Sequence, residues 1–437
     1  MSMSSSPKSA ALFERAKKVL PGGVSRNTLL RGQHPLYVAK GQGCIVTDID
    51  GVERIDFANN MASHIHGHAF PPIVDAISEQ LKLGTAFTMA TEAEVRYAEH
   101  ICRRSPNFDK VRFVNSGTEA VMAGMKAARA FTGRPKIAKV EGSYHGAYDY
   151  AEVSQAPNPE NWGAIDHPNP VPLAIGTPQA VLEDMVIIPF NEPEKAIAVL
   201  NRHAGDIACI LIDPIPHRIG MVPVAENFVT ALRKWATDNG ALLMFDEVIT
   251  FRSEFGGMQE RFDAIPDLTS MGKMIGGGFP VGALAGRAQV MEVFTNGRLP
   301  HSGTFSANPV TMTAGRVAME TFDEQAVSRL NKLGYYAREN IAEAIKIADL
   351  PACVTGTGSL FRIHLKAIAP KNYREAHLSA QESKALTAMI NTLYDDGIMM
   401  IHTAAAALST PMGNAEIDHL SEAVLNALRS VKGLLRE

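Results

Sequence analysis

Two predicted strands end in residues that an aldehyde cofactor requires. The run 267–271 is followed by Gly272, Lys273 and a glycine-rich turn, and the apolar run 241–245 ends in Asp246. A lysine amine can form a Schiff base with an aldehyde, and a carboxylate can keep a ring nitrogen protonated. The pair therefore predicts pyridoxal 5'-phosphate (PLP) as a cofactor.

Two further strand ends carry groups that suit a phosphate and an aromatic ring. Residues 116–118 join a predicted strand at 111–114 to a helix, whose free N–H groups can bind phosphate. The next strand end carries Tyr144 and His145. Taken singly, a hydroxyl before a helix is usually a cap, and a tyrosine is usually packing. Their occurrence at successive strand ends favours one shared site, because open α/β sheets bind ligands there.

An open sheet is the element that must position these residues. Strands are predicted at 111–114, 136–140, 185–189, 208–212, 241–245 and 268–271. Helical stretches separate several of them, which is typical of a mostly parallel α/β sheet. We expect a long functional loop, not a linker, over 155–182, because that stretch is rich in Pro, Asn and Gly.

The two ends of the chain predict further units. Three β-type runs before residue 58 indicate a small antiparallel sheet, and the pattern changes after residue 323. There the predicted elements are a helix at 325–346, a β run at 354–365, a helix near 381–395 and a helix from 415. We expect an N-terminal segment over 1–69 that packs with the small domain, a large domain over 70–322, and a small C-terminal domain over 323–437.

Composition excludes several classes of protein. A net charge of −4 argues against nucleic acid as a main partner, since phosphates need a basic excess. No apolar run reaches the roughly 18 residues of a membrane span, and the serine-rich start resembles no signal peptide. The four cysteines lack metal-ligand spacing. We expect a cytoplasmic protein without a metal site.

Six segments match one family in residue type and order. They are Pro21–Val24, Asn115–Ala120, Gly142–Gly146, Phe245–Val248, Gly272–Lys273 with Gly276–Gly278, and His301–Pro309. Through them the chain resembles class III aminotransferases of fold type I, in the branch around glutamate-1-semialdehyde aminomutase. It is also similar to aminotransferases of β-amino acids and D-phenylglycine. The resemblance implies a large domain with a mostly parallel seven-stranded sheet, and a smaller α+β domain formed by the N- and C-terminal segments.

The resemblance also implies roles for the residues that touch the cofactor. Lys273 would hold PLP as a Schiff base and then carry a proton between Cα and C4′. Asp246 would pair with the pyridinium nitrogen, as a charge-assisted hydrogen bond. Ser116, Gly117 and Thr118 would hold the phosphate.

The remaining implied contacts lie around the ring and across a subunit boundary. Tyr144 would stack on one face of the ring with His145 beside it, and Val248 would pack on the other face. Thr304 would reach the phosphate from the neighbouring subunit, which makes a homodimer the minimum working unit.

Substrate recognition is less clear, because the sequence departs from the family there. Arg26 matches a substrate-binding arginine of the β-amino-acid enzymes, with a solvated loop arginine as the alternative. Their second arginine, and a nearby acidic residue of the aminomutase, are both missing around Thr403. His217 and Arg218 would lie beside the phenolic oxygen of PLP, and Arg218 could bind a carboxylate instead. The alanine run 404–407 would leave an open, apolar pocket wall.

Several functions remain open. The leading hypothesis is transfer of an amino group between a β-amino acid, aromatic amino acid or related amine and a 2-oxo acid, either pyruvate or 2-oxoglutarate. The alternatives are a glutamate-1-semialdehyde-type 2,1-aminomutase, a racemase or eliminase on the same fold, and a non-catalytic binding protein. A nicotinamide dehydrogenase is excluded, since no Gly-x-Gly-x-x-Gly follows an early strand.

Overall fold

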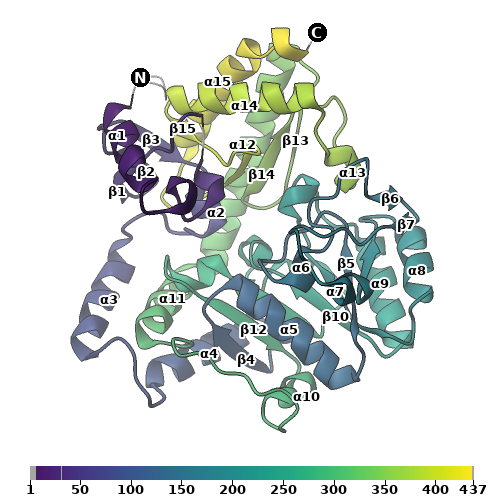
Figure 1. Cartoon of the computed structure of the whole chain (residues 1–437). Helices are drawn as coiled ribbons and strands as arrows, with labels where there is room; N and C mark the ends of the chain where they lie inside the picture. The colour runs from purple at the N-terminus through teal and green to yellow at the C-terminus, as the bar shows by residue number, and fades with distance from the viewer. Residues whose placement is uncertain (1–5, 31, 436–437) are drawn as a thin grey trace.

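A seven-stranded sheet is the centre of the larger part of the molecule (Figure 1). The computed structural model describes residues 6–30 and 32–435; residues 1–5, the start of the serine-rich stretch, lie outside it. The strand order is β4-β12-β11-β10-β9-β5-β8. The bounds are β4 Lys110–Val114, β5 Lys136–Val140, β8 Met185–Ile188, β9 Ile207–Ile212, β10 Leu242–Asp246, β11 Leu268–Gly272 and β12 Gly282–Gly286.

The pairing confirms the predicted mostly parallel sheet. Neighbours from β11 to β8 are parallel, and only β12 runs antiparallel to both of its neighbours, β11 and β4. Strand β9 is buried at every position, as expected for a strand that helices cover on both faces. The covering helices include α5 (Gly117–Thr132), α8 (Pro193–Asn201) and α9 (Glu226–Asp238).

The two ends of the chain together form the smaller α+β part. β1 (Val38–Gln42), β2 (Ile45–Asp48) and β3 (Glu53–Asp56) are antiparallel, and β15 (Ile398–Met399) joins β3 in parallel. A second sheet contains β13 (Cys353–Thr355), β14 (Leu360–His364) and β16 (Ala405–Ala407). The fold class is confirmed, whereas the exact domain boundaries stay predictions.

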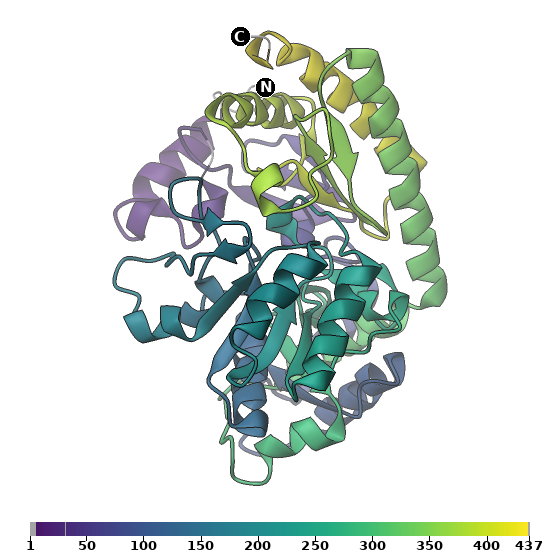
Figure 2. The ribbon, with the colours of Figure 1, turned by 90° about the vertical axis from the view of Figure 1, so that its right-hand side faces the viewer.

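Long helices cover the smaller part. α14 (Ala380–Asp395) and α15 (Asn414–Ser430) lie at its top, and α12 (Glu324–Ala348) runs down the side of the molecule (Figure 2). The buried Arg252 ties the two parts together, because it donates hydrogen bonds to Ser359 Oγ and to the carbonyls of Ala62 and Leu408.

The other elements are short or lie at the edges. The remaining helices are α1 Pro7–Ala16, α2 Asn59–Ala62, α3 Pro71–Leu83, α4 Glu92–Arg104, α6 Asp149–Glu152, α7 Gln179–Glu183, α10 Ala288–Met291, α11 Pro309–Thr321 and α13 Tyr373–Ala376. The expected loop at 155–182 contains the hairpin β6 (Gly163–Ala164) and β7 (His167–Pro168) and most of α7. In the described part of the chain, no helix has the length and apolarity to cross a membrane.

One prediction about the smaller part is wrong. The alanine run 404–407 was expected to form an open pocket wall, but all four residues are 0% exposed. Most of the run is β16, which pairs with β14, and its small side chains pack in the core on both faces of that strand.

Candidate active site

A cavity of about 150 Å³ opens where β9, β10 and β11 end and α5 begins. Its lining residues are Gly117, Thr118, Val121, Tyr144, His145, Gly146, Asp213, Asp246, Val248, Ile249 and Lys273. Most of the predicted cofactor contacts therefore lie around one space, at the edge of the sheet where open α/β folds bind ligands.

Lys273 follows β11 directly and adopts a backbone conformation that lysine rarely occupies. It is the first residue of η7 (Lys273–Gly276), and its φ is 50°. Such strain persists only where the surrounding structure enforces it, and it is concentrated at functional sites. Burial lowers the pKa of Lys273 to about 8, although the charges of Asp246 and Asp213 oppose the shift. A useful fraction of neutral, nucleophilic amine is therefore present near neutral pH.

Asp246 is held in place by three hydrogen bonds. His145 Nδ1 donates to Oδ2 at 2.7 Å. The Val248 N–H and the Ser270 hydroxyl donate to Oδ1 at 3.1 and 3.3 Å. Burial lowers the pKa of His145, so a neutral ring with its proton on Nδ1 is favoured. The carboxylate thus faces the cavity in a fixed orientation.

The start of α5 packs so tightly that glycine is required at two positions. A Cβ on Gly117 would lie 2.9 Å from a methyl carbon of Val248, and one on Gly146 would lie 2.4 Å from Thr118 Oγ1. Thr118 Oγ1 accepts a hydrogen bond from Ala147 N at 3.2 Å. Ser116 is the N-cap of the helix, and its hydroxyl oxygen accepts a hydrogen bond from the backbone N–H of Glu119 at 3.1 Å. The predicted turn is therefore present, but the Ser116 side chain caps the helix and is absent from the cavity lining.

The loop that carries Tyr144 is held in place by the side chain of one buried lysine. The fully buried Lys139 donates to the carbonyls of Ser143, Ala151 and Val153 at 3.0, 2.8 and 2.7 Å. Tyr144 itself is 49% exposed, so its ring lies at the mouth of the cavity. The loop position is therefore fixed although its tyrosine is open to solvent.

The same loop is also held from the smaller part of the molecule. Arg374 in α13 makes a two-pronged ion pair with Glu141, at 2.8 and 2.9 Å. The ring of Tyr373 packs on Gly142, where a Cβ would lie 2.0 Å from it. Glu141 and Gly142, the residues held by these contacts, lie just before Tyr144 in the chain.

Two buried acids at strand ends were not predicted as site residues. Asp213 follows β9 and lines the cavity, and burial together with the charge of Asp246 raises its pKa well above the usual range. Glu247 accepts hydrogen bonds from Met258 N, Gln259 N and Thr250 Oγ1, and burial raises its pKa to about 7. An acid directly after an apolar run was the available signal.

Three predicted residues are absent from the lining of this cavity. Arg26 donates to Asn60 Oδ1 at 2.9 Å and lines a separate cavity of about 310 Å³. Arg218 donates from Nε to the carbonyl of Gln155 at 2.9 Å. Thr304 is exposed in the loop before α11.

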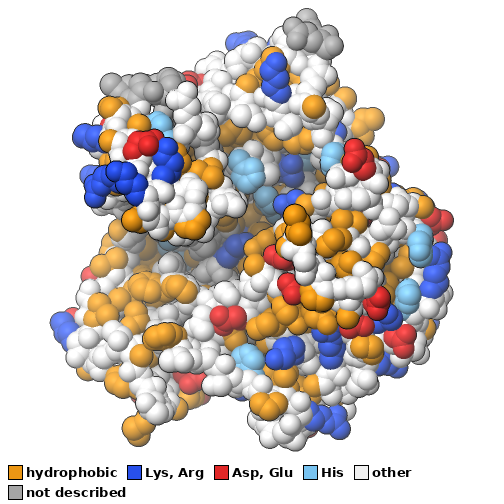
Figure 3. Space-filling view, viewed as in Figure 1, with side chains coloured by type: hydrophobic (Ala, Val, Ile, Leu, Met, Phe, Trp, Pro, Cys, Tyr) orange, Lys and Arg blue, Asp and Glu red, His pale blue; other side chains and the backbone are white. Residues whose placement is uncertain are grey.

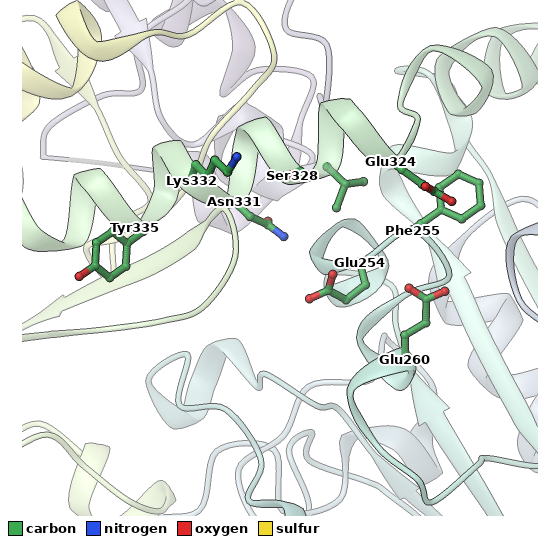
Figure 4. Close-up of a pocket in the computed structure, with 9 residues that line it drawn as sticks. Glu254, Phe255, Glu260, Glu324, Ser328, Asn331, Lys332 and Tyr335 are labelled. Atoms are coloured by element: carbon green, nitrogen blue, oxygen red, sulfur yellow. The ribbon is translucent and has the colours of Figure 1, made fainter.

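A more voluminous cavity, of about 550 Å³, lies against α12 (Figure 4). Its lining includes Lys332 and Tyr335 on the helix and Glu254 and Glu260 on neighbouring segments. It contains none of the residues described above. Within the ranges 6–30 and 32–435, no group of three or more His, Cys, Asp or Glu side chains could hold a metal ion.

Comparison with known proteins agrees with this geometry. The model of the family "Aminotransferase class-III" matches residues 29–428. A glutamate-1-semialdehyde 2,1-aminomutase from Methanothermobacter thermautotrophicus is 42% identical over 85% of this chain and 87% of its own length. A solved ω-transaminase from Sphaerobacter thermophilus is 45% identical, with a TM-score of 0.93 over 97% of this chain and 98% of that one. A β-phenylalanine aminotransferase from Variovorax paradoxus is 32% identical, with a TM-score of 0.86 over 97% and 94%.

The residues present fit the cofactor of this family. The cavity offers a lysine amine, a fixed carboxylate and the N-terminus of a 16-residue helix, which are the partners that the aldehyde, ring nitrogen and phosphate of PLP require. The predicted family, fold and cofactor are thus confirmed. The chain belongs to the class III aminotransferase family of PLP-dependent enzymes, which act on small amino substrates.

Proposed function

We propose that this chain moves an amino group on a small carboxylic acid, with Lys273 as the residue that carries PLP and relays the proton. The observation that supports this most is the presence of Lys273 and Asp246 on one cavity. PLP supplies an aldehyde and an electron-withdrawing ring. The lowered pKa of Lys273 leaves the amine ready to accept a proton from the substrate carbon and to return it elsewhere.

The surrounding residues then orient the ring. Asp246, fixed by His145, keeps a proton on the ring nitrogen. Gly117 and Thr118 offer backbone N–H groups to the phosphate. Tyr144 and Val248 flank the ring.

The first reaction to test is 2,1-aminomutation, in which donor and acceptor positions belong to one molecule. The curated relatives support it, because the aminomutase of Methanothermobacter thermautotrophicus is 42% identical over most of the chain. Our leading hypothesis from the sequence, transfer to a separate 2-oxo acid, is the second candidate. The similarity to the ω-transaminase and the β-phenylalanine aminotransferase supports it, as does the absence of an acidic side chain at Thr403.

One experiment separates the two reactions. The purified enzyme is incubated with glutamate-1-semialdehyde alone, and then with β-amino acids and aromatic amines plus pyruvate or 2-oxoglutarate. A mutase completes many turnovers without an added oxo acid, whereas a transaminase stops after half of one cycle. Absence of both activities in protein that shows bound PLP would contradict amino-group transfer altogether.

Arg26 and Arg218 are proposed to bind the carboxylates of the substrates. The guanidinium of Arg26 projects toward Asn60 in the cavity of about 310 Å³, whose other walls are mostly apolar. That combination suits a carboxylate attached to an apolar side chain.

We also propose a homodimer. The end of α3 and the segment after it expose Leu83, Phe87 and Met89 by 74%, 52% and 82%, and Phe305 beside Thr304 is 61% exposed. Figure 3 shows hydrophobic side chains gathered around α3. Such exposure is typical of an interface. Thr304 does not line the cavity of its own subunit, so it would be free to reach the cavity of the partner subunit. Light scattering that gives the mass of one chain at micromolar concentration would contradict this.

A further inference from the structure

Two arginines beside the site have no carboxylate partner. Arg362 lies on β14, is 5% exposed, and donates from Nη1 to the carbonyl of His217 at 3.1 Å. Its Nε has no hydrogen-bond partner within the described residues. Arg218, next in the chain to His217, is bonded through Nε to the Gln155 carbonyl. Both guanidinium groups therefore keep unused donors.

The charges of both arginines act on His217, and the charge of Arg218 also acts on Tyr144 at the mouth of the candidate active site. Burial lowers the pKa of His217 well below its usual range, and the charges of Arg362, Lys273 and Arg218 add to the shift. Burial and the charge of Arg218 lower the pKa of Arg362 to about 10. The groups thus crowd positive charge into one region close to Lys273.

The surface is hollowed over β14, the strand that carries Arg362. Figure 3 shows a hollow in the centre of the face, over β14 and between the N-terminal lobe and the segments near α13, with Lys or Arg and His side chains in it. Two other arginines are paired with acids, Arg374 with Glu141 and Arg54 with Asp48, whereas the buried Arg252 and Arg104 donate to backbone carbonyls. In the part of the chain that the structure describes, neither Arg218 nor Arg362 forms such an ion pair.

A buried, unpaired cation is costly, and a bound anion offsets that cost. We propose that Arg218 and Arg362 form a subsite for a carboxylate of the substrate, so that one substrate of this enzyme is a dicarboxylic acid. The proposal rests on the amino-transfer function proposed above. Arg26, in its separate cavity, is available for a carboxylate of its own. A guanidinium presents paired donors that match the two oxygens of a carboxylate.

Binding of unreactive acids tests the subsite without catalysis. Calorimetry on the PLP-loaded enzyme compares glutarate with butyrate, in which a hydrogen replaces one of the two carboxylates. We expect glutarate to bind about tenfold more tightly or better, the effect of one charge-assisted contact. In Arg362→Met and in Arg218→Met this preference should fall to about twofold or less, while the affinity for butyrate changes little. Arg429→Met, on the exposed face of α15, should keep the full preference.

Because Arg362 is buried, Arg362→Lys serves as a second variant that keeps the charge and should retain part of the preference. Equal binding of glutarate and butyrate to the unaltered enzyme overturns the subsite, and so does a full preference in folded Arg362→Met and Arg218→Met proteins. If amino transfer itself fails, no donor reacts although PLP is bound. The glutarate preference is then still measurable, so the two failures are distinguishable.

Discussion

The cavity at the strand ends and the cavity around Arg26 are built in different ways. The first is lined by residues that directly follow β9, β10 and β11, and its charged groups bond to one another or lie fully buried. The second is lined by an N-terminal loop, the strands β1, β2, β3 and β15, α2 and Tyr394, and its Arg26 is bonded to Asn60 in an exposed position. The proposed catalytic groups thus lie on the rigid sheet, and the carboxylate site proposed around Arg26 lies at the N-terminal loop, in a segment that can vary.

The same difference sets the expected size of mutational effects. Charges in the buried cavity interact in a low-dielectric environment, where they are strong. Exposed charges are screened, and a single pair contributes about 1 kcal/mol or less. Substitutions at the strand ends should therefore reduce catalysis, whereas those around Arg26 should change substrate affinity.

The largest effect is expected from Lys273→Ala. Loss of the amine removes both the covalent attachment and the proton relay, so kcat should fall by at least about 10³-fold. PLP should still bind, but without its attachment it should be lost on dialysis. Steady-state kinetics and absorbance spectra measure both effects, with the exposed Lys332→Ala as the control. Turnover of the Lys273→Ala protein within tenfold of the parent would contradict the assignment of the site.

Asp246→Asn should have the next largest effect. The amide keeps the size of the side chain but loses the charge that stabilises a protonated ring nitrogen, so kcat should fall by about 10²-fold. His145 would lose its carboxylate partner at the same time. The absorbance band of bound PLP should shift, a change that a purely structural defect would not produce. The exposed Asp238→Asn is the matched control, and unaltered kinetics in Asp246→Asn would argue against a role at the ring.

A third effect concerns pH. Only the neutral amine of Lys273 is nucleophilic, and its pKa is lowered to about 8. The rate of PLP attachment to the apoprotein should therefore rise by roughly tenfold per pH unit below 8 and level off above it. Stopped-flow absorbance from about pH 6 to about pH 11 measures this. A plateau reached only near pH 10, the range of an ordinary lysine, would show that burial does not set the reactivity.

Sequence reasoning identified the first cavity because its signals are local. Lys273 and Asp246 each directly follow an apolar run, and the carboxyl ends of parallel strands necessarily meet at one edge of the sheet. Asp213 carries the same signal after β9, although it was not predicted as a site residue. Proximity of such ends could be inferred without any knowledge of side-chain packing.

Other features depend on contacts that no local pattern reveals. β12 reads Gly-Ala-Leu-Ala-Gly, a composition with weak strand propensity, and it was not predicted. Its glycine at 282 is required because a Cβ there would lie 2.0 Å from the Ser116 carbonyl oxygen, a contact made between distant segments. The burial of the alanine run likewise follows from the pairing of β14 with β16.

Arg26→Met should have the smallest effect, and it sharpens the comparison between the two cavities. The arginine is exposed, so loss of its contact with a substrate carboxylate should raise KM only about three- to fivefold and leave kcat nearly unchanged. Arg15→Met, also exposed in the N-terminal segment, is the control. A fall in kcat without a change in KM would place Arg26 in the chemical step. The division between a rigid catalytic cavity and a separate recognition cavity would then be wrong, because one residue of the second would act in the first.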